Sequence, residues 1–206
     1  MYKVAVFVSG RGSNLKSILD FFPQAEKTIQ IVCVVSDKAD CLAYEIADSY
    51  NIPTYSVSNK SDVGFVTYSK LLSIFDEFKV DLIVLAGFLK KIPDILTEKF
   101  ERKIINIHPA LLPSFGGKGM YGLNVHKAVF EKSVQISGAT VHFVDKIYDN
   151  GKIIAQESVD ISDVNSPEEI AKRVLKIEHQ LLPKVILKFS ENKVVEKNHR
   201  IYILKK

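Results

Sequence analysis

The stretch "KVAVFVSGRGSNLKSILDFF", residues 3–22, decides the fold. It joins an apolar run, a turn that contains glycine and a run with helical spacing, which is the pattern of a strand followed by a helix. The strand part is almost wholly apolar rather than alternating between apolar and polar residues. Strands that are covered by helices on both faces have this composition, and they belong to parallel sheets. We therefore expect the chain to begin with the first strand and helix of an α/β fold.

The same strand-then-helix pattern recurs along the first hundred residues. The further expected strands are "IQIVCVVS", "PTYSV" and "DLIVLAGF", and the helical stretches are "CLAYEIADSY", "VTYSKLLSIFDEF" and "PDILTEKF". A fifth apolar run, "KIINIH", ends at residue 108. This alternation predicts a doubly wound, mostly parallel sheet of the Rossmann-like type.

After residue 108 the pattern changes. Two strand-like runs, "ISGATVHFVD" and "IIAQESVDI", flank the turn sequence "YDNGK" and predict an antiparallel hairpin. A long amphipathic helix should follow, with Ser166 as N-cap, Pro167 at the first helical position and Glu169 completing a capping box. We expect residues 1–206 to form a single domain with an N-terminal half, 1–100, and a C-terminal half, 101–206.

The composition is that of an ordinary globular protein, with 47% hydrophobic and 25% charged residues, which argues against wholesale disorder. No apolar stretch approaches the ~20 residues that cross a bilayer, and "MYKVAVFVSG" fits a buried strand better than an export signal. A cytoplasmic, soluble protein is expected. The net charge of +4 suits an anionic small substrate, but a solvated basic tail in "ENKVVEKNHRIYILKK" explains it equally well.

The turn "VSGRGSNL" is a candidate phosphate site, because it joins the first strand to a helix N-terminus, where free N–H groups and the helix dipole favour anions. Its spacing matches neither a Walker loop nor the dinucleotide fingerprint, so a single phosphate fits better. The glycines here are Gly10 and Gly12, followed by Ser13 and Asn14. The alternative is that Ser13 only caps the helix and the glycines only turn the chain.

Asn106 and His108 indicate a candidate catalytic site at the end of the fifth strand. Strand alternation turns both to the same side, at the sheet edge where α/β proteins bind ligands. An imidazole can act as general acid or base, while an amide donates to an oxygen that gains negative charge. No serine or cysteine nucleophile stands in a recognisable elbow nearby, so direct attack by a substrate group is expected. The alternative is a satisfied core histidine beside an asparagine that forms a turn.

A histidine that moves protons usually has an orienting carboxylate. Asp149, in the turn "YDNGK", is the best candidate, and Asp145 competes with it. Asp149 could also be only a turn former, and His142 could either order such a network or fill the strand. The histidines, cysteines and carboxylates show no spacing typical of a metal site, so a metal-free mechanism is predicted.

Seven stretches of the chain occur together in one known family, in the same order and spacing. They are "VFVSGRGSNL", "SDKADCLAYEIA", "DLIVLAGFLKKI", "IINIHPALLPSFGGKG", "GATVHFVD", "DNGKIIAQ" and "IEHQLLP". With them the chain resembles, over nearly its whole length, the phosphoribosylglycinamide (glycinamide ribonucleotide) formyltransferases of purine synthesis. The Asn-x-His-Pro-x-Leu-Leu-Pro run is shared by several enzymes that use 10-formyltetrahydrofolate, and the Ser-Gly-x-Gly-Ser-Asn turn indicates an acceptor with a ribose phosphate.

The resemblance implies that the formyl group of 10-formyltetrahydrofolate passes to the amine of glycinamide ribonucleotide by direct attack and without a metal. It implies that Asn106 polarises the formyl oxygen, that His108 shuttles the proton and that Asp149 keeps His108 protonated. The partners would be these two small molecules, with no nucleic acid and no membrane, and the chain would be a monomer or homodimer.

The resemblance also implies which residues bind the substrates, with the phosphate in the N-terminal half and the folate and catalysis mainly in the C-terminal half. Gly12, Ser13 and Asn14 would hold the phosphate, and Glu178 the ribose. The folate would be bound by Asn106, by the strip Leu89, Lys90, Lys91 and Ile92, and by the loop from Val144 to Asp149, which includes Asp145. The chain departs from the common family pattern at Lys90, Lys91 and Lys152, around Gly64, where no basic residue stands, and in the long loop 114–122.

Three other functions stay open. Methionyl-tRNA formyltransferases add a C-terminal RNA-binding barrel, and formyltetrahydrofolate hydrolases add an N-terminal regulatory domain, for which this sequence shows no segment. The third alternative is not an enzyme but a non-catalytic module that only binds a nucleotide. The set of Asn106, His108 and Asp149 argues against that module, because a protein that only binds nucleotide has no need of a proton shuttle.

Overall fold

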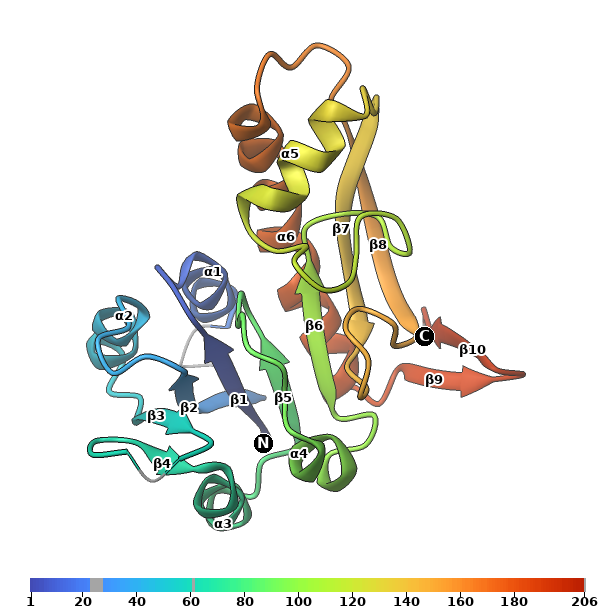
Figure 1. Ribbon diagram of the computed structural model, residues 1–206. Coiled ribbons are helices and arrows are strands. Elements are labelled where there is room, and N and C mark those ends of the chain that lie inside the picture. Colours follow the sequence, from blue (N-terminus) through green and yellow to red (C-terminus); the bar gives the residue numbers. More distant parts are fainter. Residues whose placement is uncertain (23–27, 61, 206) are drawn as a thin grey trace. The chain divides into compact units, whose positions relative to one another are not determined.

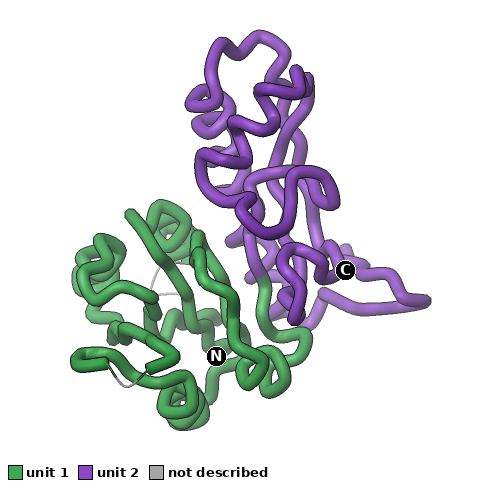
Figure 2. The backbone as a smooth tube through the Cα atoms, in the orientation of Figure 1, with its two compact units in different colours: residues 1–105 green, residues 106–206 purple. Residues whose placement is uncertain are grey.

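A computed structural model describes residues 1–22, 28–60 and 62–205. The chain divides into two compact units, residues 1–105 and residues 106–206 (Figure 2). The division falls inside strand β6 (Ile104–His108), directly before Asn106. Among the described helices, none combines the length and the apolar character that a bilayer crossing needs.

The first unit alternates strands and helices (Figure 1). Its strands lie in the order β4-β3-β2-β1-β5, their pairings are parallel, and the first residues of β6 continue the sheet beside β5. Helix α1 contacts α2, α3 contacts α4, and these two pairs cover opposite faces of the sheet. The predicted doubly wound sheet is confirmed. The elements are β1 (Tyr2–Val8), α1 (Ser13–Phe21), β2 (Ile29–Ser36), α2 (Ala43–Ser49), β3 (Thr54–Ser58), β4 (Val66–Thr67), α3 (Tyr68–Phe78), β5 (Leu82–Leu85) and α4 (Asp94–Lys99).

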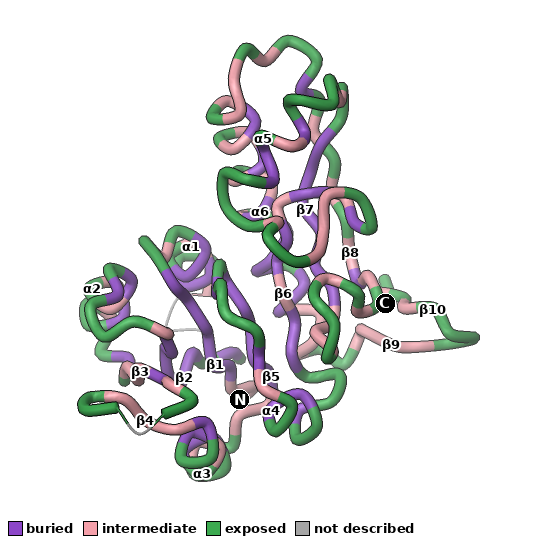
Figure 3. The backbone as a smooth tube through the Cα atoms, in the orientation of Figure 1, coloured by how far each residue is buried: buried purple, intermediate pink, exposed green. Residues whose placement is uncertain are grey.

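The core of the first unit explains its continuous apolar runs. In β1, residues 4–8 have no exposed surface, and all four residues of β5 are buried (Figure 3). Neighbouring strands lie on both sides of β1 and helices lie above and below it, so a polar side chain on either face would lose its contact with water.

The second unit contains the remainder of β6, followed by α5 (Leu123–Glu131), β7 (Ile136–Phe143), β8 (Ile153–Asp160), α6 (Pro167–Ser190), β9 (Val194–Lys197) and β10 (Arg200–Ile203). Strands β7 and β8 form the predicted antiparallel hairpin, and α6 packs on both of them and on α5. The Ser166 hydroxyl caps α6 by accepting from the Glu169 N–H at 3.3 Å, while the Glu169 carboxylate accepts from the Asn165 N–H at 2.9 Å. The predicted cap is therefore present, with its return bond one residue earlier than in the standard capping box.

The connection between β7 and β8 is longer than the predicted Asp-Asn-Gly turn, because it takes in residues 144–152. Asp145 holds its first part by accepting from the Ile147 N–H at 2.7 Å. The chain returns to β8 through Gly151, where a Cβ atom would stand only 1.8 Å from the Phe143 carbonyl oxygen. Only glycine fits that approach, so this part of the turn sequence is explained by close packing rather than by a tight turn.

The C-terminal segment is a hairpin, which corrects the interpretation of it as a solvated basic tail. Strands β9 and β10 pair antiparallel, and β10 contacts β8. Asn198 and His199 form the turn with φ of 51° and 62°. The Lys152 ammonium lies 2.6 Å from the Glu196 carboxylate, which connects β9 to the end of the 144–152 loop.

Candidate active site

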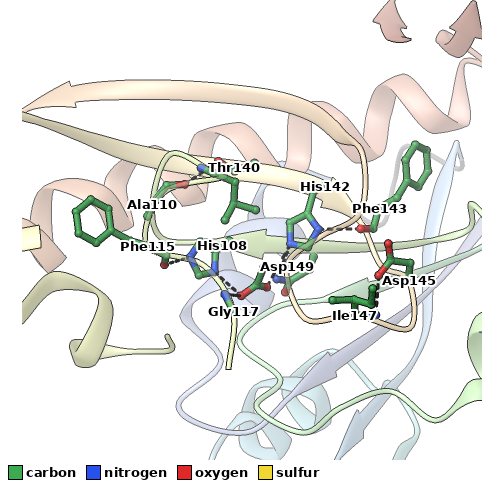
Figure 4. A network of polar contacts seen from close by, with 12 residues as sticks. His108, Ala110, Phe115, Gly117, Thr140, His142, Phe143, Asp145, Ile147 and Asp149 are labelled. Carbon is green, nitrogen blue, oxygen red and sulfur yellow. Dashed lines mark hydrogen bonds and ion pairs between the residues drawn. The ribbon is translucent and has the colours of Figure 1, made fainter. Parts of the chain in front are cut away.

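Asn106 and His108 lie on β6, where strand alternation turns them to the same side, as the sequence predicts. The Asn106 side chain is partly buried, and only 3% of His108 is exposed. Figure 4 shows His108, His142 and Asp149 pointing toward one another. A partly buried amide, two buried imidazoles and a carboxylate thus lie close together in the second unit.

Asp149 lies between the two histidines. One of its oxygens is 3.7 Å from His108 Nδ1, and the other is 3.6 Å from His142 Nε2 (Figure 4). The Gly117 N–H donates to the first oxygen at 2.9 Å, and the carboxylate side chain is only 12% exposed. Its backbone φ of 52° is unusual for a residue other than glycine. The surroundings therefore hold this carboxylate against His108 despite the cost of its backbone conformation.

Asp145, the competing carboxylate, makes different contacts. It accepts from the Ile147 N–H at 2.7 Å and from the Asn150 side-chain amide at 3.3 Å, both within its own loop. Asp145 and Val144 are partly buried where the chain leaves β7. Asp145 thus shapes the loop that presents Asp149, while Asp149 makes the contact with His108.

His142 is held as a neutral ring. Its Nδ1 lies 2.7 Å from the Phe143 carbonyl, which can only accept, so the proton is on Nδ1. Nε2 is then free to accept from the Asn106 side-chain amide at 3.1 Å. Burial lowers the pKa of His142, which agrees with the neutral form. His142 therefore fixes the orientation of the Asn106 amide, because only the NH₂ end of that amide can donate to Nε2.

The loop after Pro113 supplies backbone groups to the site. His108 Nε2 donates to the Phe115 carbonyl at 2.9 Å, while the Gly117 N–H holds Asp149. With Nε2 beside a carbonyl and Nδ1 beside a carboxylate, a protonated His108 ring has an acceptor near each nitrogen. Part of the 114–122 loop thereby gains a role in positioning His108 and Asp149.

A third histidine, His126 on α5, is also buried, at 5% exposure. Burial lowers its pKa to about 4, and the nearby His108 contributes in the same direction. Its Nδ1 is buried and has no hydrogen-bond partner among the described residues. Sequence reasoning did not single out His126, because a lone histidine in a helix carries no motif. With its pKa lowered by burial, His126 is expected to be a neutral core side chain at ordinary pH.

In the first unit, the predicted phosphate residues lie where β1 passes into α1. Gly12 has φ +76°, and a Cβ atom there would be 2.6 Å from the Ala43 Cβ. Gly12, and not Ser13, is the N-cap of α1, and α1 shows no side-chain cap. Ser13 is exposed in the first turn, and Asn14 is 7% exposed. The alternative role for Ser13 as a helix cap is therefore not observed.

The remaining predicted binding residues lie in both units. In the first unit, the strip that follows β5 has Leu89 43% exposed, Lys90 and Lys91 exposed, and Ile92 buried. In the second unit, Glu178 lies on α6 and is 8% exposed. The structure therefore brings the catalytic candidates together within one unit, while the phosphate turn and the strip belong to the other. In the described ranges 1–22, 28–60 and 62–205, no group of three or more His, Cys, Asp or Glu side chains is placed to hold a metal ion.

Comparison with known proteins identifies close relatives by name. The chain is 42% identical over 194 residues to the chloroplastic phosphoribosylglycinamide formyltransferase of Arabidopsis thaliana, spanning 93% of this chain but only 66% of that protein. It is 35% identical over 204 residues to the phosphoribosylglycinamide formyltransferase of Haemophilus influenzae, covering 98% of this chain and 94% of the relative.

The same family is found among solved structures. The phosphoribosylglycinamide formyltransferase of Anaplasma phagocytophilum is similar with a TM-score of 0.88 and 34% sequence identity, covering 99% of this chain and 94% of that one. The formyl transferase family also matches residues 2–186. The chain therefore belongs to the formyl transferase family, and its predicted resemblance to the phosphoribosylglycinamide formyltransferases is confirmed.

Proposed function

We propose that this chain transfers the formyl group of 10-formyltetrahydrofolate to the amine of glycinamide ribonucleotide, in de novo purine synthesis. The observation that carries the proposal is the arrangement at the end of β6, where Asp149 lies within 3.7 Å of His108 Nδ1 and Asn106 is oriented by His142. The named relatives support the same reaction. A cytoplasmic location stays a prediction from the sequence.

In the proposed reaction the glycyl amine attacks the formyl carbon, and the carbon–nitrogen bond to the folate breaks after a tetrahedral intermediate has formed. Negative charge develops on the formyl oxygen. The Asn106 amide has two N–H groups, of which one donates to His142, so the other can donate to that oxygen. Because the His142 ring fixes the orientation of the amide, the NH₂ group of Asn106 is already oriented as a hydrogen-bond donor before the substrate binds.

His108 is proposed to move the proton from the attacking amine to the leaving folate nitrogen. Each ring nitrogen of His108 lies near an acceptor, the Phe115 carbonyl or the Asp149 carboxylate. Donation to the substrate therefore requires that one of these contacts be exchanged for the reacting group. Asp149 stabilises the protonated ring by its charge, and its position in a mostly buried setting strengthens that effect.

The two binding regions of the first unit complete the proposal. The N-terminal turn of α1, after the left-handed Gly12, would bind the acceptor phosphate through Ser13 and Asn14. The strip from Leu89 to Ile92 would bind the pterin of the donor, with Lys90 and Lys91 acting through backbone groups. In the second unit, Glu178 would contact the ribose and the loop from Val144 to Asp149 would contact the folate.

The decisive experiment mixes the purified chain with the formyl donor and glycinamide ribonucleotide and follows loss of the formyl group. Transfer that depends on the acceptor is expected in buffer containing a chelator. His108→Ala should abolish transfer while nucleotide affinity stays close to wild type, and Asn106→Ala should lower turnover by about 10²-fold. Equal loss of formyl groups with the acceptor omitted would show a hydrolase instead.

A comparison of two loop variants tests the role of Asp149. Asp149→Asn removes the charge that favours protonated His108, so turnover should fall steeply and its pH profile should move to lower pH. Asp145→Asn removes a carboxylate of the same loop that has no contact with His108 and whose hydrogen bonds shown in the structure stay within that loop, so the pH profile should keep its wild-type position. A shifted profile in Asp145→Asn with an unshifted one in Asp149→Asn would assign the role to Asp145.

A further inference from the structure

The hydroxyl of Ser9 joins the ends of three neighbouring strands in the first unit. Ser9 directly follows β1 and is only 2% exposed. Its Oγ accepts from the Leu89 N–H at 2.9 Å, after β5, and donates to the Asp37 carboxylate at 2.5 Å, after β2. Since β2 and β5 both pair with β1, one buried hydroxyl connects the segments that follow all three strands.

The direction of these hydrogen bonds is fixed by chemistry. A carboxylate can only accept, so the Ser9 O–H must point to Asp37, which leaves the oxygen lone pairs for the Leu89 N–H. The Ser9 N–H also donates to the Gly87 carbonyl at 3.2 Å. Ser9 thus holds the segment 87–89 through its backbone and its side chain, with the carboxylate setting the orientation of the hydroxyl.

Asp37 itself is partly buried. It lies near Tyr68, whose pKa is raised to about 12 by burial and, in second place, by the charge of Asp37. A hydrogen bond to a charged group in a partly buried setting is stronger than a neutral one in water. The link from Leu89 through Ser9 to Asp37 is therefore well suited to hold a chain segment in one position.

We propose that Ser9 and Asp37 are positioning residues for the formyl donor. They hold the first residue of the strip Leu89–Ile92, which the proposed function assigns to the pterin, so this inference rests on that function. Because Leu89 is anchored while Lys90 and Lys91 are exposed, the backbone groups of the strip are presented in a fixed place. A strip that is already ordered before binding loses less conformational entropy when the donor binds.

The proposal predicts a specific kinetic pattern. Ser9→Ala removes the acceptor of the Leu89 N–H, and Asp37→Ala removes the group that orients the hydroxyl. Each change should raise the KM for the donor by about 10-fold, the loss expected for one buried hydrogen bond of this kind, with kcat changed by less than about 3-fold. Because both residues act through the same link, the double variant should be no worse than Ser9→Ala alone.

Two further variants separate positioning from a general loss of stability. Asp37→Asn keeps an acceptor oxygen for the Ser9 hydroxyl and should recover most of the donor affinity lost in Asp37→Ala. Ser137→Ala is the matched control, because Ser137 is also 2% exposed but lies on β7, and its hydroxyl has no partner among the described residues. Its donor KM should equal that of wild type. If Ser9→Ala does not fold, the two Asp37 variants carry the test.

Hydrogen exchange of the Leu89 amide supplies a readout that needs no substrate. In full-length Ser9→Ala and Asp37→Ala the segment 87–92 should exchange faster than in wild type and Ser137→Ala. Unchanged exchange, or an unchanged donor KM in an enzyme that transfers formyl groups, would overturn the positioning role alone. A wild-type chain that neither transfers the formyl group nor binds tetrahydrofolate in calorimetry would overturn the proposed function and this inference with it.

Discussion

Replacement of His126 by leucine should make the free energy of unfolding less dependent on pH. His126 is 5% exposed, its Nδ1 has no partner among the described residues, and its pKa is lowered to about 4 by burial and then by the charge of His108. Leucine has a similar size and cannot take up a proton. The change therefore removes one titrating group from the core without leaving a new polar group unpaired.

The magnitude follows from proton linkage. In the unfolded chain a histidine titrates near its ordinary pKa of 6.5, while in the folded chain His126 titrates near 4. The unfolded chain therefore binds the proton more tightly, and stability falls as the pH drops from above 6.5 toward 4. At pH 5 protonation of this histidine favours the unfolded chain over the folded chain by a factor of about 30. The free energy of unfolding is therefore about 2 kcal/mol lower at pH 5 than at pH 7.5.

Urea unfolding followed by circular dichroism, at a series of pH values from 7.5 to 5, measures this difference. The wild-type free energy of unfolding should fall more steeply than that of His126→Leu, by about 2 kcal/mol over this interval. His142 and His179 also have lowered pKa values and add to the slope in both proteins, so the comparison isolates His126. His199→Asn, at an exposed hairpin turn, is the control and should keep the wild-type slope. Equal slopes for wild type and His126→Leu would refute the argument.

Two further predictions concern the first unit. Gly12→Ala should raise the KM for the acceptor by roughly 10-fold or more, because alanine is strained at φ +76° and its Cβ would lie 2.6 Å from the Ala43 Cβ. Steady-state kinetics with varied acceptor concentration measures this KM. An unchanged KM would show that the turn does not bind the phosphate. Cys33 should resist alkylation at pH 8 in the folded chain, since burial raises its pKa to about 12, and peptide mass spectrometry should find it modified only after unfolding. Rapid modification of Cys33 under native conditions would contradict this.

The fold of the first unit could be predicted because its signal lies in side-chain character. The residues of β1 and β5 must be apolar on both faces, and position 12 has a left-handed backbone conformation that favours glycine. The residue types in the sequence therefore indicate directly where the buried strands and the turn lie. The cap of α6 at Ser166 could be predicted for the same reason, since the hydroxyl itself forms the bond.

The site was predictable only in part. The same-side placement of Asn106 and His108 follows from strand periodicity, but the groups that hold His108 and Asp149 are the Phe115 carbonyl and the Gly117 N–H. Backbone groups are present at every position and leave no signal in the residue types. The hairpin of β9 and β10 was missed because its residues are partly buried or exposed and its charges resemble those of a solvated tail.

The Lys152–Glu196 contact has a practical consequence for anyone who shortens or extends this chain. A deletion that begins after Lys193 would take away Glu196 and leave Lys152 without that carboxylate, at the end of the loop that presents Asp149. An addition after Leu204 would begin beyond both strands of the hairpin. Affinity tags and fusion partners therefore belong after the final strand, and the last dozen residues should be kept even though they look expendable in the printed sequence.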